Sequence, residues 1–564
     1  MARPAGLVYA ADETPPPLIL LLSALQHVGV IAITLVYPII IAREAGLSPK
    51  ELLDVVSLSM FALGAATVLL SARSPISGAN FLCPACYTAI YLGPSLFALR
   101  YGGLALVFGM TMVAGFTEIA IAPLLRRLRP MFPPEIAGLV IAVVGLSLAF
   151  LGARYSLGIT SQHGIQPAYL AIAGSALATM IVLNIWTKGY TKLFCALIGM
   201  GVGFAASAML GEFDMSVAIP PEGLEILRVP GFQHVSWRFD AVLIAPFLVA
   251  ALASTLRLMG DVSTAQRLND ADWVRPSMRS LSGGVAGLGL ASVFCGLVGV
   301  PGVNTSSQSM GLCSATGITS RALVYAIAII YALMAFVPAV AVGFATMPPP
   351  VMGASLFFAS LFIFTNGLQM MTARMLDSRK TIVIGTSFAM AVMADVYHDL
   401  FAGLPAVLQP VFGSSLVVGT VCAVLLNLVM RIGVRQRVSL RLAAGQIDRE
   451  AVERFFSEQG ARWAARRDIV NRATFGAVQV LEVLGDPPGG VEIEASFDEF
   501  NLEVRIRYVG TPLALPEHKP TPREIVANED GERLLAGYLL RRSADRISSH
   551  TSGDRCEVHL HYDH

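Results

Sequence analysis

Long apolar stretches recur along this chain up to about Met430, and they are the feature that most limits its fold. Each has about the length that an α-helix needs to cross a bilayer, roughly 17 to 25 residues. The first, PLILLLSALQHVGVIAITLVYPIIIA, is too long for the apolar part of a signal peptide and lacks a small-residue cleavage site. Because 55% of the residues are hydrophobic and only 14% are charged, we predict an integral membrane protein.

Two of the apolar stretches have the composition of broken helices. The runs ISGANFLCPACYTAIYLGP and VPGVNTSSQSMGLCSATG are rich in Gly, Pro, Ser and Asn, which cannot sustain a long helix facing lipid. Such a pair, in corresponding places of two halves, is typical of a transporter binding site. Counting these and other glycine-interrupted stretches, we expect fourteen spans, centred near Val30, Phe61, Ala89, Met112, Val143, Ala176, Met200, Ala251, Leu290, Met310, Ile330, Ala359, Met390 and Val421.

The two broken segments are the third and the tenth, seven apart. Seven is odd, so a second copy of a seven-helix repeat would be inverted in the membrane. The predicted fold class is therefore an all-α polytopic membrane protein of fourteen segments, a 7+7 inverted repeat, plus a small cytoplasmic α+β domain. Basic residues support an inner (plasma) membrane protein with both termini cytoplasmic. They gather in the loops that this orientation places inside, for example Arg126, Arg127, Arg129, Lys188, Lys192, Arg267 and Arg279.

The chain changes character at about Arg431, where charged and polar residues take over. The run from RQRVSLRLAAG to VQVLEVL has helical periodicity, GVEIEASFDEFNLEVRIRYVG predicts a β-hairpin, and DRCEVHLHYDH predicts a final strand. We expect three parts: a cytoplasmic N-terminus at 1–17, a transmembrane domain at 18–432, and a cytoplasmic α+β domain at 433–564.

Several function classes are excluded by what the sequence holds. The net charge is +1 and the seven cysteines are scattered, so neither nucleic-acid binding nor a disulfide framework is indicated. No GxxxxGK[ST] motif occurs, which argues against an ATP-driven pump. We expect no enzymatic activity, no metal and no resident cofactor, and coupling to H⁺ or Na⁺ stays open.

Several long motifs, in order, resemble the nucleobase-ascorbate transporter family, also called xanthine/uracil permease-like. They are YAADETPPPLILLLSALQHVGV, MFPPEIAGLVIAVVGLSLA and SGGVAGLGLASVFCGLVGVPGVNTSSQSMGLCSATGITSR, and together with later motifs they cover roughly residues 8–432. The resemblance implies a core domain (spans 1–4 and 8–11), a gate domain (spans 5–7 and 12–14) and homodimers. It also implies a substrate held between the short helices of segments three and ten, with elevator-type motion of the core.

The resemblance also implies which residues form the site. The run QSMGLCSATG (Gln308 to Gly317) matches the family signature, so Ser307, Gln308 and Ser309 would bind substrate, with Ser309 where the family usually has Asn. Phe81 aligns with a pocket-lining Phe. The expected supporting residues are Gln26, His27, Asn80, Gly311 and Thr316. We assign His27 a structural hydrogen bond near the site, and Glu118, in span four, is interpreted as a protonated or paired carboxyl.

Arg257 is the departure that matters most. It stands where nucleobase transporters of this family carry a glutamate that binds the base and is thought to couple to protons. Arginine has only donors and keeps its charge, so it can do neither, and within a span it needs a partner. Two partners stay open: Asp261 one turn later, or an anionic substrate such as urate or a carboxylate.

The sequence therefore predicts a secondary transporter of a small planar or anionic metabolite, similar to xanthine, uracil or urate. The alternatives are an organic-anion (carboxylate) transporter on the same fold, and a ligand sensor that signals through its cytoplasmic domain. That domain resembles a degenerate histidine-kinase-type ATPase fold. Its YVGTP loop lacks the adenine-recognising Asp, and VNRATFGAVQVL lacks the acidic residue and the spaced Asn of a magnesium-binding helix, which argues against nucleotide binding.

Overall fold

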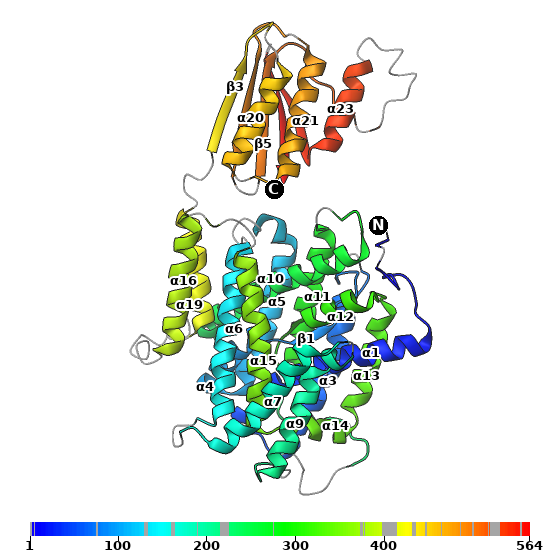
Figure 1. Cartoon of the computed structure of the whole chain (residues 1–564), viewed down its shortest axis with the longest axis vertical. Helices are drawn as coiled ribbons and strands as arrows, with labels where there is room; N and C mark the ends of the chain where they lie inside the picture. Colours follow the sequence, from blue (N-terminus) through cyan, green and yellow to red (C-terminus); the bar gives the residue numbers. More distant parts are fainter. Residues whose placement is uncertain are drawn as a thin grey trace. The chain divides into compact units, whose positions relative to one another are not determined.

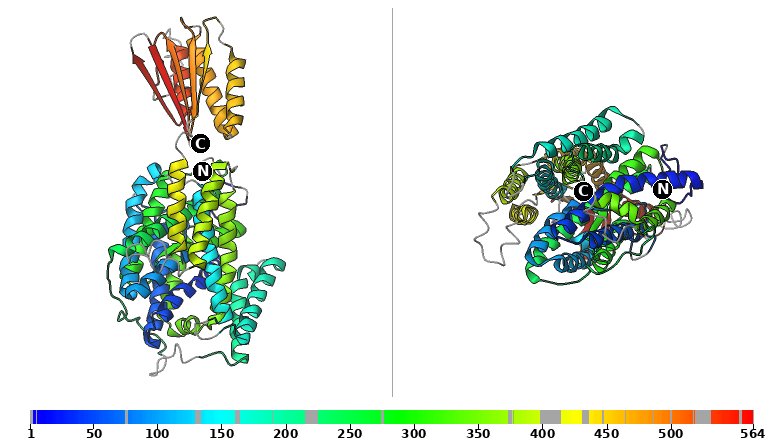
Figure 2. Two further views of the ribbon diagram at one scale, coloured as in Figure 1. Left: turned by 90° about the vertical axis from the view of Figure 1, so that its left-hand side faces the viewer. Right: turned by 90° about the horizontal axis from the view of Figure 1, so that it is seen from below.

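The computed structural model divides the chain into two compact units, Met1–Asn427 and Leu428–His564 (Figures 1 and 2). It describes residues 3–4, 6–74, 77–128, 134–159, 164–188, 190–214, 225–273, 276–372, 376, 378–397, 414–430, 436–445, 448–463, 465–485, 487–498, 501–516, 518, 531–552 and 555–563. Each unit is described below by itself.

The first unit is built mainly of helices, and all fourteen predicted centres lie in them. The helices are α1 (Pro17–Ala32), α2 (Val36–Glu44), α3 (Pro49–Ser71), α4 (Ala89–Gly102), α5 (Leu104–Leu128), α6 (Pro134–Leu157), α7 (Pro167–Trp186), α9 (Cys195–Met209), α10 (Ile244–Asn269), α11 (Met278–Leu297), α12 (Ser307–Thr316), α13 (Ala322–Ala335), α14 (Pro338–Ala345), α15 (Pro349–Met371), α16 (Ser378–Val396) and α19 (Ser415–Met430). Among the described residues, eight helical stretches are long and apolar enough to cross a membrane, or nine if the bent pair α13 and α14 forms one span. The protein is thus a mostly helical, polytopic membrane protein.

Close helix pairs build the interior of this unit. The most extensive packing joins α6 to α15, α5 to α11 and α3 to α13 (Figure 1). In the α5–α11 pair the backbones touch at Gly115 and Gly289, where a Cβ on Gly115 would lie 2.6 Å from the Gly289 carbonyl oxygen. Only glycine allows such an approach, and small residues at helix contacts are usual in membranes.

The two broken segments meet as a short β-ladder. Strand β1 (Ala85–Tyr87) pairs in antiparallel fashion with β2 (Val303–Thr305). Their backbone groups are therefore paired within the protein, as a non-helical stretch in a membrane requires. Helix α4 starts directly after β1 and α12 directly after β2, so the ladder sets the position of both short helices.

The second unit holds a five-stranded antiparallel sheet in the order β3-β4-β5-β7-β6. The strands are β3 (Gln436–Leu442), β4 (Val491–Phe497), β5 (Asn501–Val509), β6 (Arg546–Ser552) and β7 (Arg555–Asp563), and the helices are α20 (Arg449–Arg462), α21 (Arg467–Leu484) and α23 (Gly531–Ser543). The predicted hairpin is confirmed by the pairing of β4 with β5. The apolar core includes side chains from the strands and from all three helices.

One prediction for this unit was wrong at its start. Residues 436–442 were expected to be helical, but they form the edge strand β3, paired with β4. Their apolar residues alternate with polar ones, and the exposure of the strand alternates accordingly toward its end. An alternation of apolar and polar side chains with a period of two residues is typical of a half-buried strand. The helical pattern proper begins only at α20, where Asp448 caps the first turn.

Candidate functional site

The N-termini of α4 and α12 both adjoin the β1–β2 ladder. The Thr88 side chain caps α4 by accepting from Ile90 N, and Ser306 caps α12 by accepting from Ser309 N at 3.3 Å. A helix start offers unpaired N–H groups and a partial positive charge. Two such starts therefore favour an anion or a group rich in acceptor oxygens between them.

Arg257 reaches this place from the neighbouring helix α10. Its Nη1 donates to Thr88 Oγ1 at 3.1 Å, and its side chain is partly buried. The guanidinium carries five N–H donors, and this is the one hydrogen bond that it makes within the described part of the chain. It thus adds a full positive charge beside a helix start that is itself positive.

Asp261, one turn later on α10, is hydrogen-bonded to residues other than Arg257. Its Oδ2 accepts from Thr305 Oγ1 at 2.5 Å, and Ser307 also adjoins this carboxylate. Arg257 and Asp261 are both described, and they form no direct ion pair, although their charges interact through space. Of the two partners left open by the sequence, the internal ion pair is therefore not formed in this structure.

The side chains in the first turn of α12, the helix that carries the signature run, differ in their exposure. Gln308 is exposed and Ser307 half-buried, whereas Ser309 is buried and its hydroxyl lacks a hydrogen-bond partner among the described residues. A Cβ added at Gly311 would have no atom within 4 Å, and the same holds at Gly260 of α10 and Gly93 of α4. Open space thus borders all three helices that meet at the ladder.

Other predicted residues lie apart from these contacts. Phe81 is buried. The carbonyl of Asn80 accepts from Arg321 Nη1 at 3.2 Å, and Asn80 has the left-handed φ of 63°. Thr316 Oγ1 accepts from Ile318 N, which helps to end α12. The hydrogen bonds of Asn80 and Thr316 therefore stabilise the local fold.

The Gln-His pair lies on α1, which packs against α12. Gln26 is half-buried, and His27 is 2% exposed. The His27 Nδ1 atom is buried and has no hydrogen-bond partner among the described residues. The structural hydrogen bond that we predicted for His27 is therefore not seen at this nitrogen.

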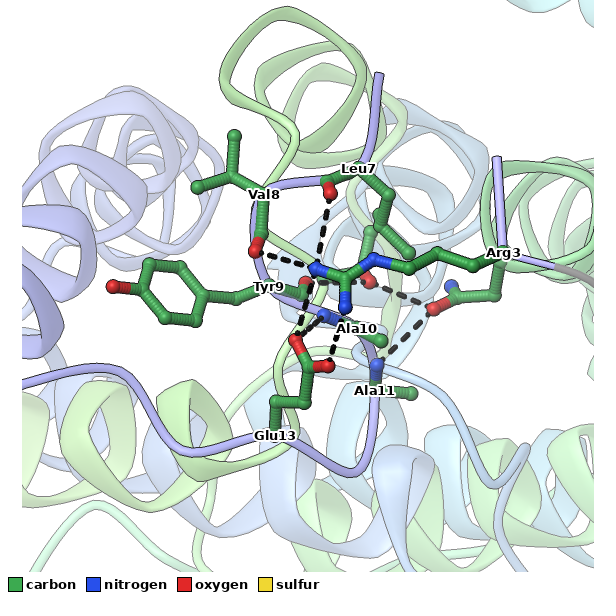
Figure 3. A network of polar contacts seen from close by, with 9 residues as sticks. Arg3, Leu7, Val8, Tyr9, Ala10, Ala11 and Glu13 are labelled. Carbon is green, nitrogen blue, oxygen red and sulfur yellow. Dashed lines mark hydrogen bonds and ion pairs between the residues drawn. The ribbon is translucent and has the colours of Figure 1, made fainter. Parts of the chain in front are cut away.

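The far end of α12 is held by the N-terminal segment, drawn in Figure 3. Val8 N donates to the Gly317 carbonyl at 2.8 Å, and Thr319 N donates to the Tyr9 carbonyl at 2.9 Å. Within this segment, Arg3 forms an ion pair with Glu13, with 2.8 Å between Nη1 and Oε1. Gly317 has a φ of 68°, and a Cβ there would lie 2.4 Å from the Gly6 carbonyl oxygen.

Thr88 and Thr305, which contact Arg257 and Asp261, were missed by sequence reasoning. Each stands next to a short helix, where a Ser or Thr residue commonly caps the first turn. That signal was present at Thr88, which directly precedes the apolar run AIYLGP.

Comparisons with known proteins agree with this architecture. A family model described as a permease family, Xan_ur_permease, matches residues 18–400. The xanthine permease XanP of Escherichia coli (strain K12) is 25% identical over 440 residues, 75% of this chain and 94% of that protein. The uric acid transporter UacT of the same organism is 28% identical over 436 residues, 74% of this chain and 87% of that protein.

Among solved structures, the transmembrane domain of the cyanobacterial bicarbonate transporter BicA is similar. Its TM-score is 0.51 at 16% identity, and the match covers 68% of this chain and 98% of that chain. At this identity the likeness concerns the fold alone.

Proposed function

The chain belongs to the permease family whose model matches residues 18–400, and on that premise we propose that it carries a small planar anion of the urate or xanthine type across the membrane. The family and the relatives are permeases, so the chain is a membrane transporter and not an enzyme. The relatives named for xanthine and uric acid support this substrate class.

The observation that carries the proposal is Arg257 beside Thr88. A guanidinium and two helix starts give one small volume three sources of positive charge. With Asp261 held by Thr305, an anionic substrate would supply the missing countercharge. It would also take up the spare guanidinium donors in charge-assisted hydrogen bonds. Arg257, Asp261, Ser307, Gln308 and Ser309 would bind it, with Phe81 lining the pocket.

The packing of the first unit supports fourteen spans in two inverted halves. Helix contacts occur in matched pairs: α3 with α13 corresponds to α11 with α5, and α1 with α13 corresponds to α10 with α5. The β1–β2 ladder and the α6–α15 pair each join equivalent elements of the two halves. These are the relations expected of a pseudo-twofold axis in the membrane plane.

We further propose that a core moves against a gate in an elevator-type cycle. The core would hold α1 to α5 and α10 to α14, and the gate would hold α6, α7, α9, α15, α16 and α19. Packing within each set is extensive, and the contacts between the sets are mainly those of α6 with α10 and α4 and of α9 with α1. The site helices α4 and α10 thus adjoin this boundary. Homodimers and cytoplasmic termini complete the proposal.

Uptake into proteoliposomes tests the function. We expect saturable uptake of labelled urate or xanthine, competed by the unlabelled compound, and weaker uptake of neutral uracil. Uptake of an aromatic carboxylate in place of both purines would indicate the organic-anion alternative. Saturable binding without any flux would contradict transport and point to a sensor.

A further inference from the structure

The described part of the membrane unit buries four carboxyl side chains, those of Asp54, Glu118, Glu135 and Asp261. Three of them have a cation nearby, two of them in a direct ion pair. Asp54 pairs with Arg228 at 2.6 Å, Glu135 pairs with Lys380 at 2.9 Å, and Asp261 interacts with Arg257.

Glu118 is the exception. It lies on α5 with 0% exposure, and no described cation lies within ion-pair distance of it. Its Oε1 accepts from Tyr91 OH at 2.8 Å, and its Oε2 accepts from Ser292 Oγ at 2.9 Å. Ser254 of α10 also adjoins it. The titratable groups facing it are Tyr91 on α4 and the Cys295 thiol on α11.

An isolated carboxylate at this depth costs several kcal/mol, which two neutral hydroxyl donors offset only in part. Adding a proton to one carboxylate oxygen removes the charge. The resulting O–H needs an acceptor, and a hydroxyl of the cluster can turn to accept it. The same side chains therefore satisfy both forms of Glu118, with opposite hydrogen-bond directions.

The cluster is connected to the candidate substrate site. Asn304 Nδ2 donates to Ser254 Oγ at 3.0 Å and to the Ser254 carbonyl at 2.9 Å. Asn304 Oδ1 accepts from Thr305 N at 2.6 Å, and the Thr305 hydroxyl donates to Asp261. Ser254, Asn304 and Thr305, all of which belong to the proposed core, thus form a continuous set of polar contacts between the Glu118 cluster and Asp261.

We propose that Glu118, in place of a carboxyl at position 257, is the residue that binds and releases a proton during transport. This inference rests on the proposed function. Arg257 keeps its charge throughout and cannot take up a proton, whereas Glu118 can exchange one where the cycle opens its cluster to water. Protonated and ionised Glu118 would orient the Ser254 hydroxyl differently, and Ser254 lies on α10 together with Arg257 and Asp261, which links the proton to the substrate site.

The test compares Glu118→Gln with Glu135→Gln, a matched change at a buried carboxyl that has its own lysine. Proteoliposomes are assayed for accumulation of labelled urate or xanthine driven by an inwardly directed pH gradient, and for exchange of labelled against unlabelled substrate. We expect gradient-driven accumulation to fall at least tenfold in Glu118→Gln, whereas the exchange of labelled against unlabelled substrate is kept. We expect Glu135→Gln and the wild type to keep both.

Equal gradient-driven accumulation by Glu118→Gln and the wild type would overturn the inference, as would wild-type accumulation that ignores the pH gradient. A wild type that neither binds nor exchanges these substrates would instead overturn the proposed function. If Glu118→Gln fails to fold, Tyr91→Phe removes one donor from the carboxyl and should shift the pH of half-maximal accumulation. An unchanged pH profile in Tyr91→Phe would then contradict the proposal.

Discussion

Arg257 Nη1 lies 3.1 Å from Thr88 Oγ1, so the guanidinium of α10 contacts the residue that caps the start of α4. The positive guanidinium thus lies beside the partial positive charge at the start of α4. Asp261, the nearest acidic residue on α10, is hydrogen-bonded to Thr305 and does not pair with Arg257. An anion between the guanidinium and the helix start would balance this charge, as the proposed function requires.

Replacing Arg257 with alanine should weaken the binding of anionic substrate. Charge-assisted hydrogen bonds contribute about 1.5 to 3 kcal/mol each, so we expect affinity for urate to fall about 10- to 100-fold. Arg267→Ala is the control, because Arg267 is exposed near the end of the same helix. Competition uptake in proteoliposomes measures both. Equal losses in the two variants would contradict the role given to Arg257.

A large side chain at Gly311 should block the site without unfolding the protein. A Cβ there meets no atom within 4 Å, so Gly311→Leu fits sterically but occupies space that we assign to substrate. We expect uptake to fall at least tenfold at an unchanged melting temperature. Gly343→Leu, in α14, also points into open space and serves as the control. Normal uptake by Gly311→Leu would show that substrate lies elsewhere.

Gly317→Ala should loosen the N-terminal segment. The φ of 68° is unfavourable for alanine, and its Cβ would lie 2.4 Å from the Gly6 carbonyl oxygen. The left-handed conformation alone costs about 1 to 2 kcal/mol. We expect a lower melting temperature and faster amide hydrogen exchange of residues 8–13, because Val8 N and Tyr9 N donate to the Gly317 carbonyl. Gly343→Ala should leave this exchange unchanged, and equal protection of residues 8–13 in Gly317→Ala and the wild type would refute the prediction.

The second unit should lose stability in acid, partly through His559. Burial lowers the pKa of His559 below its ordinary value, and Glu503 opposes this only partly. A histidine with a lowered folded pKa stabilises the fold above the unfolded pKa, about 6.5. That contribution is lost as the pH falls through the folded pKa.

Hydrogen exchange of the β5 and β7 peptides in the full chain, corrected for intrinsic rates, measures this effect between pH 7.5 and about pH 5. His559→Gln should reduce the pH dependence of protection. His550→Gln changes a histidine on the neighbouring strand β6 and should leave that dependence as it is. The same pH dependence in the wild type and in His559→Gln would exclude the assignment.

Much of the membrane fold could be predicted because its signals are local. Apolar length placed all fourteen helix centres, and the Gly, Pro, Ser and Asn content marked the two segments that form β1 with α4 and β2 with α12. The resemblance to nucleobase-ascorbate transporters is confirmed by the match over residues 18–400. These patterns arise from residues that are close together in the sequence, so they can be recognised in one sequence without a structure.

The contacts of the site could not be predicted in the same way. Thr88 meets Arg257 across 169 positions of sequence, and nothing near either residue encodes that meeting. The strand β3 was assigned to a helix because its short alternating run adjoins a long helical one. The docking of residues 8–13 near the end of α12 combines backbone hydrogen bonds with bonds to side chains far along the chain, such as those of Asn269 and Ser320, so no local pattern predicts it.

The β1–β2 ladder also sets an order of events during synthesis. Residues 85–87 enter the membrane long before residues 303–305 have been translated, yet each strand is the other's partner. Backbone N–H and C=O groups are costly to leave unpaired in lipid. In a chain with only its first seven segments inserted, β1 would therefore lack its partner strand, and the proposed binding site could form only after residues 303–305 have been made.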